Sequence, residues 1–157
     1  MAIQTRLRRL PLSAALSALL VASPFATVFA QALPLARTAG DAALKWGGCP
    51  EFMPKGCEIA VLHGDPAKHN ADVFFKVPAN AAIPRHWHTS AERMVLVAGE
   101  LHVTYDGHAT AVLKPGTYAY GPPKLPHRAE CKSAVPCVLF IAFETPVDAV
   151  AVGPPAK

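Results

Sequence analysis

The sequence predicts an all-β fold, a sandwich or barrel formed by one domain. Three observations support this prediction: many short β-rich runs follow one another at regular spacing, 16 prolines are spread over the 157 residues, and no segment has the pattern of an amphipathic helix. No internal repeat or low-complexity linker divides the chain. We therefore expect a single barrel-like domain.

The expected strands are runs rich in β-branched and aromatic residues, bounded by turn residues. The run 71–78 (ADVFFKVP) is the strongest, and within 100–114 the pair Asp106-Gly107 is typical of a two-residue hairpin turn. The other expected strands lie within 58–64, 83–99, 114–123, 126–132 and 137–146.

The first 30 residues read as a secretory signal peptide. Three arginines within residues 6–9 give a positive start, an apolar run follows over 10–22, and small or aliphatic residues occupy 28–30 before a cleavage site. An uncleaved N-terminal anchor is the alternative. Cleavage after Ala30 predicts a periplasmic or secreted protein with no membrane association.

Loss of this leader removes three of the 15 basic residues and none of the 11 acidic ones, so the formal charge of the remainder is 12 − 11 = +1. No basic run remains that would indicate binding to nucleic acid or to an anionic membrane. The mature chain is expected to consist of an extension and loop over 31–57, the barrel over 58–146 and a flexible tail over 147–157.

Four cysteines fall into two local pairs, as expected of disulfides in an oxidising compartment. Of the three connectivities that four cysteines allow, the spacing favours Cys49–Cys57 and Cys131–Cys137. The second pair flanks SAVP, which predicts a hairpin turn with the two cysteines on paired strands. A structural zinc site is a distant alternative, because neither pair has CxxC spacing.

The segment PRHWHTSAERMVLVAGE, residues 84–100, places two histidines and a glutamate at positions of one parity. On a strand, His86 and His88 point to the same side, and Glu92 joins them if strand geometry continues through residues 89–91. Such a trio facing the inside of a barrel is costly unless a divalent metal lies between its members. The alternative is a pair of surface histidines around Trp87.

With its surroundings, this segment resembles the first motif of the cupin superfamily, G-x5-H-x-H-x3,4-E-x6-G. His86, His88, Glu92 and Gly99 fall at matching spacings, and Asn80 replaces the leading glycine. The second motif, G-x5-P-x-G-x2-H-x3-N, is matched by Gly116, Pro122 and His127. Lys124 stands where a glycine is usual, and Cys131 where an asparagine is usual.

The resemblance covers about 59–143. It implies a double-stranded β-helix, or jelly roll, in which His86, His88, Glu92 and His127 bind one divalent transition metal. Iron is the metal expected first, with manganese, nickel, copper or zinc as alternatives. The stretch 60–88 is also similar to a group of small exported bacterial cupins with no assigned role. Cupins commonly form dimers, so a homodimer is a further expectation.

A site with these four ligands leaves up to two positions on an octahedral ion for substrate, water or dioxygen. The resemblance therefore implies a metal-dependent enzyme acting on a small organic substrate, with a dioxygenase as the first expectation and an isomerase or lyase as the alternative. A periplasmic module that binds or senses a small ligand or metal without catalysis is the other hypothesis.

Other polar residues are assigned outside the metal site. Tyr118 and Tyr120 alternate along one strand and are weak candidates for contacts with a substrate. The side chains of Arg93 and Arg128 are expected at the surface. The remaining histidines in strands and turns are expected to be solvated: His63, His69, His102 and His108.

Overall fold

The structure, a computed structural model, describes residues 33–153, and these form one compact unit from Leu35 onward. The predicted signal peptide lies outside the described residues. Within them the chain forms eleven strands and no helix, so the all-β prediction is confirmed. No helix within residues 33–153 is long and apolar enough to cross a membrane.

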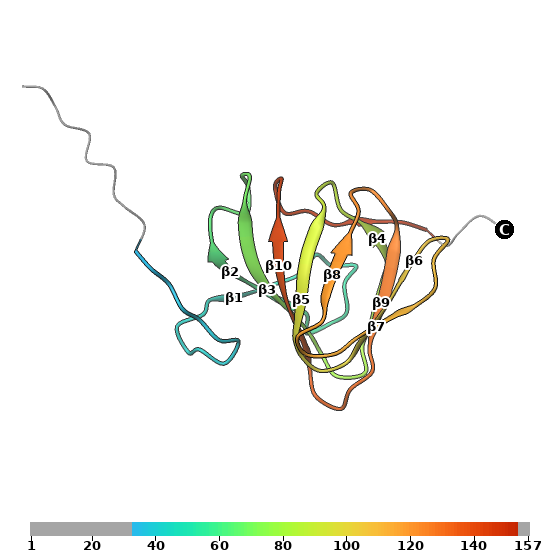
Figure 1. Ribbon diagram of the computed structural model, residues 1–157, viewed down its shortest axis with the longest axis horizontal. Coiled ribbons are helices and arrows are strands. Elements are labelled where there is room, and N and C mark those ends of the chain that lie inside the picture. Colours follow the sequence, from blue (N-terminus) through green and yellow to red (C-terminus); the bar gives the residue numbers. More distant parts are fainter. Residues whose placement is uncertain (1–32, 154–157) are drawn as a thin grey trace, which may run out of the picture. The chain divides into compact units, whose positions relative to one another are not determined.

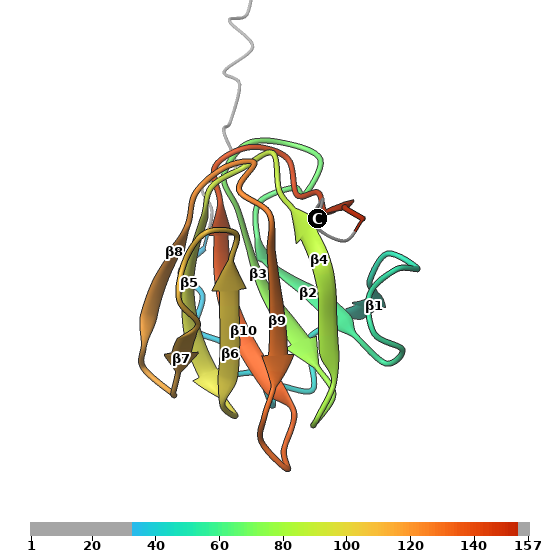
Figure 2. The ribbon, with the colours of Figure 1, turned by 90° about the vertical axis from the view of Figure 1, so that its right-hand side faces the viewer.

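The strands form two facing antiparallel sheets, as expected of a jelly roll (Figure 1). The six-stranded sheet has the order β1 (Trp46–Gly48), β2 (Glu58–His63), β3 (Ala71–Val77), β10 (Cys137–Phe143), β5 (Glu92–Ala98) and β8 (Tyr118–Gly121). The five-stranded sheet has the order β11 (Val150–Ala151), β4 (Ala82–Trp87), β9 (His127–Cys131), β6 (Leu101–Tyr105) and β7 (Ala111–Leu113). Figure 2 shows β7, β6, β9 and β4 in front of the larger sheet.

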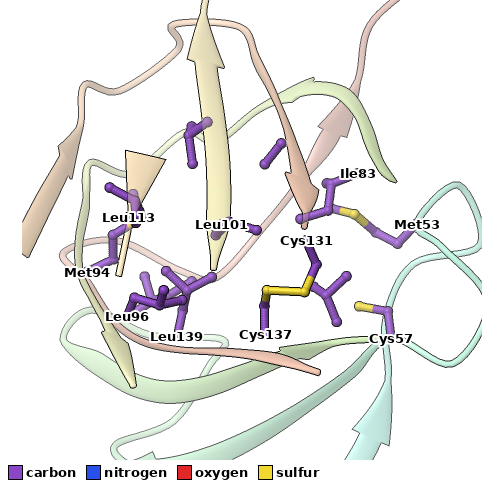
Figure 3. Packing of buried hydrophobic residues seen from close by; sticks show 14 of the residues in the cluster. Met53, Cys57, Ile83, Met94, Leu96, Leu101, Leu113, Cys131, Cys137 and Leu139 are labelled. Carbon is purple, nitrogen blue, oxygen red and sulfur yellow. A yellow bond between two sulfur atoms is a disulfide. The ribbon is translucent and has the colours of Figure 1, made fainter. Parts of the chain in front are cut away.

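The core fills the space between the two sheets. Strand alternation sends Leu96 and Leu139 inward from the larger sheet and Leu101 and Leu113 inward from the smaller one, and all four are buried (Figure 3). Burying each such side chain contributes about 1.5–3 kcal/mol. Apolar packing between the two sheets therefore contributes to holding them together.

Most connections cross between the sheets, and two of them correct two predictions. Strand β4 ends at Trp87 in the smaller sheet and β5 starts at Glu92 in the larger one, so the strand does not continue through residues 89–91. Likewise β9 and β10 lie in opposite sheets, so SAVP does not form a hairpin between paired strands. A barrel built from facing sheets requires such crossings, and strand parity along the sequence does not reveal them.

Both predicted disulfides are present: Cys49–Cys57 and Cys131–Cys137. The Cys131–Cys137 bridge joins the end of β9 to the start of β10 and therefore links the two sheets covalently (Figure 3). This bond accounts for a cysteine where the cupin motif usually has an asparagine.

Asp106-Gly107 lies in the connection between β6 and β7, which pair as a hairpin. The prediction of a hairpin is confirmed, but its loop is longer than two residues, because Val103 pairs with Ala111. The turn is closed by a hydrogen bond of 3.0 Å from the His108 amide to the Tyr105 carbonyl.

Strand β4 contains an irregularity that sets the direction of His86. Ile83 pairs with Ala129, whereas His86 pairs with His127, so three residues of β4 span two of β9. This β-bulge contains Pro84 and Arg85, and it allows both Ile83 and His86 to be buried although they are three residues apart.

The ends of the barrel differ from the prediction. Strand β1 lies in the expected extension and pairs with β2, so residues 46–48 belong to the sheet. The segment 147–153 is not a free tail: β11 pairs with β4, and the Val147 amide donates to the Pro66 carbonyl at 2.8 Å. Backbone pairing holds this segment, although its sequence carries no strong strand pattern.

The departures from the cupin motifs have a common geometric explanation. Asn80 and Lys124 occupy the left-handed region, with φ of 57° and 60°, where the motifs usually have glycine. The Lys124 amide donates to the His88 carbonyl at 2.8 Å, so the loop before β9 is bound to the residue that follows β4. The two substitutions therefore preserve the backbone path of the motif.

Candidate metal centre

Three of the four predicted ligands come from the smaller sheet. His86 lies in β4, His88 follows its last residue, and His127 is the first residue of β9 and pairs directly with His86. One ring nitrogen from each histidine lies within 4.8 Å of the others, and all three side chains are buried. The strands thus bring together residues that are about 40 positions apart in the chain.

Glu92 reaches the same point from the larger sheet, as the first residue of β5. Its Oε1 lies 3.3 Å from His88 Nε2 and its Oε2 lies 3.7 Å from His127 Nε2. The predicted proximity of Glu92 to the histidines is therefore correct, but its cause is the crossing between sheets and not alternation along one strand.

Backbone carbonyls set the tautomer of each histidine. Their Nδ1 atoms donate hydrogen bonds to carbonyls of three different segments: His86 to Pro84, His88 to Asp148 and His127 to Leu125. Each Nε2 therefore carries a lone pair. His88 Nε2 is buried and has no hydrogen-bond partner among residues 33–153. Three neutral imidazoles and a carboxylate form a donor set that fits a divalent transition metal.

The electrostatics of the site agree with this fit. Burial, reinforced by neighbouring imidazoles, lowers the pKa of His86 to about 4 and that of His127 to about 3, so both rings are neutral at neutral pH. Burial also raises the pKa of Glu92, against the opposing effect of His88. A divalent cation would reverse the effect on Glu92, because it stabilises the ionised carboxylate.

The four residues lie at one end of a cavity of about 270 Å³ between the sheets. Most of its remaining lining is aliphatic or aromatic, and includes Phe75, Leu101 and Ile141. The loop closed by the Cys49–Cys57 disulfide contributes Pro50 and Met53 to the wall, and segment 147–149 contributes a further part. The site is therefore shielded on several sides by segments outside the two cupin motifs.

Tyr105 is a residue of this cavity that the sequence interpretation missed. It ends β6, pairs with His127, and its ring lies 4.8 Å from the His127 ring between centroids. Burial, followed by the Glu92 carboxylate, raises the pKa of Tyr105. A signal was present in the sequence, because Tyr105 has the same strand parity as Leu101 and Val103, which are buried.

The structure does not bring Tyr118 and Tyr120 to the cavity. They are 60% and 52% exposed, because on β8 the inward positions belong to Ala119 and Gly121. The arginines behave as expected, with Arg93 paired to Glu144 on the surface and Arg128 exposed.

The remaining histidines also lie apart from the metal cluster. His63, His69 and His108 are exposed, as expected. His102 is half-buried and its Nε2 lies 2.8 Å from Glu100 Oε1, so it is partnered at the surface of β6.

A two-sheet barrel that brings three histidines and a glutamate together between its sheets is the architecture of a cupin. Residues 73–143 match the family model of the cupin domain, so this part of the chain is a cupin domain. A search of curated proteins finds no sequence match.

Solved structures with the same fold include proteins from several organisms. The DMSP lyase DddQ from Ruegeria pomeroyi DSS-3 is 21% identical, with a TM-score of 0.61 over 74% of this chain and 64% of that one. The polyketide cyclase RemF from Streptomyces resistomycificus is 19% identical, with a TM-score of 0.62 over 77% of this chain and 88% of that one. KdgF from Halomonas sp. is 19% identical, with a TM-score of 0.53 over 66% and 89%.

At these identities the similarity concerns the fold alone. The chain also spans less than two thirds of the two DMSP lyase structures, 64% and 63% of their lengths.

Proposed function

We propose that this chain is an exported metal-dependent enzyme acting on a small organic molecule, with one divalent transition metal held by His86, His88, Glu92 and His127. The observation that carries the proposal is the tautomer pattern: three buried imidazoles bonded through Nδ1 to backbone carbonyls, with Glu92 against two of their Nε2 atoms. Such bonds fix metal-binding imidazoles in orientation.

A metal bound there would supply Lewis acidity toward a carbonyl or carboxylate and, if it is redox-active as iron is, chemistry with dioxygen. The protein's own residues contribute a dry, apolar wall and fixed ligand orientations. Glu92 is engaged as a ligand, so it is not available as a general base. We place a dioxygenase first, and a lyase or isomerase second; the names of neighbours with this fold include a lyase and a cyclase.

A non-catalytic module that binds a small ligand is the second candidate, and one observation favours it. The other carboxylate of the cavity lining, Asp148, accepts hydrogen bonds from the amide and the hydroxyl of Thr89. No free carboxylate therefore faces the cavity in the part of the chain that the structure describes. An enzyme built this way must rely on its metal and on hydroxyl groups.

Export is part of the proposal. It is supported by the leader pattern and by two disulfides, which are compatible with a periplasmic or extracellular protein.

The decisive experiment measures the metal content of the mature protein, produced in the periplasm and purified without a histidine tag. We expect near one equivalent of metal, lost in His86→Ala and in His127→Ala but retained in the control His102→Ala, whose side chain lies outside the cluster. Circular dichroism would show that the variants fold. Iron would place oxygenase chemistry first, whereas zinc or nickel would favour a lyase or isomerase. Wild-type protein that neither contains nor takes up metal would contradict the proposal.

A further inference from the structure

Two buried polar atoms of the cavity lack a hydrogen-bond partner among residues 33–153. They are His88 Nε2 and the hydroxyl of Tyr105. A metal would satisfy the first, but the second is the donor of a neutral phenol and requires an acceptor. Buried polar groups without a partner are rare in native proteins, so this hydroxyl points to a ligand that is not part of the chain.

The hydroxyl lies at the polar end of the cavity. A Cβ atom placed on Gly121 would lie 2.6 Å from the Tyr105 hydroxyl and 3.0 Å from Glu92 Oε2. The two oxygens therefore border the same small space, which exists because residue 121 has no side chain. An oxygen atom of a bound molecule at this end would meet the hydroxyl and the metal ligands together.

The rest of the cavity offers almost nothing polar. Along β6 the inward residues that precede Tyr105 are Val103 and Leu101, and β10 faces them with Leu139 and Ile141. Within the described chain, no lysine or arginine lines the cavity. A second anionic group or a row of hydroxyls would be buried there without a partner, at about 1–3 kcal/mol for each group and more for a charge.

We propose that the cavity binds a small molecule with an apolar body and a single oxygen-bearing end of at most one negative charge, such as a monocarboxylate, and that the Tyr105 hydroxyl donates a hydrogen bond to that oxygen. The size follows from the volume of about 270 Å³, just below the usual range of small-molecule sites. This inference rests on the proposed function, because the same polar end holds the proposed metal.

The test compares the binding of monocarboxylates (benzoate, isovalerate, hexanoate) with that of malate and glutarate by titration calorimetry. It uses the mature protein both as purified and after metal loading. We expect at least one monocarboxylate to bind ten-fold or more tightly than both dicarboxylates. Tyr105→Phe should weaken that binding about ten-fold, the value of one hydrogen bond to a charged group. The control Tyr118→Phe removes the hydroxyl of an exposed tyrosine and should change nothing.

Three results of the binding measurements would overturn the inference. They are equal binding of both classes of acid, binding of neither, or unchanged monocarboxylate binding by Tyr105→Phe. Metal content is measured on the same samples. If metal is bound but monocarboxylates are not preferred over dicarboxylates, this inference fails while the proposed function stands. If no metal is bound, the proposed function fails, and the preference for monocarboxylates is still tested on the protein as purified. Loss of metal in Tyr105→Phe would assign the hydroxyl to the metal ligands and would also overturn the inference.

Discussion

The Nδ1 atom of His88 donates a hydrogen bond to the main-chain carbonyl of Asp148, a residue 60 positions further along the chain. The Asp148 side chain fixes that carbonyl, because its Oδ1 accepts the Thr89 amide at 2.8 Å. A candidate metal ligand is therefore oriented by the segment that the sequence predicted to be a flexible tail.

Removal of this segment should weaken the metal site without touching a ligand. A chain ending at Pro146 loses the carbonyl that holds His88, and we expect its metal affinity to fall about 10- to 100-fold, as for other groups that orient metal ligands. Competition with a chelator measures the affinity. A chain ending at Gly153 keeps Asp148 and β11 and is the control. Equal affinities of the two folded proteins would contradict a role of Asp148 in orienting His88.

Gly121 should also be required for metal binding, because it leaves space for Glu92. In Gly121→Ala the new Cβ would lie 3.0 Å from Glu92 Oε2 and 2.6 Å from the Tyr105 hydroxyl, so both side chains must shift. We expect metal affinity to fall about ten-fold or more while the protein remains folded, by the same competition assay. Gly48→Ala is the matched control, since no atom lies within 4 Å of its new Cβ. Unchanged affinity in Gly121→Ala would show that Glu92 tolerates displacement.

The stability of metal-free protein should decrease as the pH falls below about 6.5. The pKa of His86 is about 4 and that of His127 about 3 in the folded state, against 6.5 for an unperturbed histidine. The unfolded chain therefore takes up protons first, and stability is lost between pH 6.5 and about 3 to 4. Urea unfolding at several pH values, after treatment with a chelator, measures this slope.

Two variants separate the contributions to that slope. His127→Gln removes one group that takes up a proton on unfolding. It should therefore reduce the slope of stability against pH by up to about 1.4 kcal/mol per pH unit. Glu92 acts in the opposite direction, because its raised pKa makes the folded state take up a proton first as the pH falls. Glu92→Gln should therefore steepen the slope. A steeper pH dependence of stability in His127→Gln than in Glu92→Gln would contradict the assigned pKa shifts.

Gly99 should be among the positions least tolerant of substitution. Its φ is +83°, and an added Cβ would lie 2.8 Å from Cys137 Sγ and 2.9 Å from Cys137 Cα. Because Cys137 is held by its disulfide, we expect Gly99→Ala to lower the free energy of unfolding by more than about 2 kcal/mol. Gly107→Ala has a similar φ of +77° with no atom within 4 Å, so it should cost only about 1 kcal/mol. If urea unfolding showed the same loss of free energy of unfolding in both variants, the close contacts at Gly99 would have to relax.

Motifs and local spacing were sufficient to predict the fold class, the two disulfides and the clustering of His86, His88 and His127. They were insufficient where distant segments meet. Tyr105 has the parity of a buried residue, but only the pairing of β6 with β9 places it beside His127. The hydrogen bond from His88 to Asp148 depends on where the chain returns after β10, which no local pattern encodes.

The bulge between Ile83 and His86 has a consequence for how this chain tolerates insertions and deletions. It acts as a phase shift: residues before it follow one inward-outward alternation and residues after it follow the other. Loss of one residue at Pro84 or Arg85 would remove the bulge and leave the histidine two positions from Ile83, so that regular alternation would still turn both imidazoles toward the core. A deletion at the bulge would thus leave the candidate metal centre in place, whereas loss of Trp87 would make the two histidines adjacent and turn one of them to the opposite face.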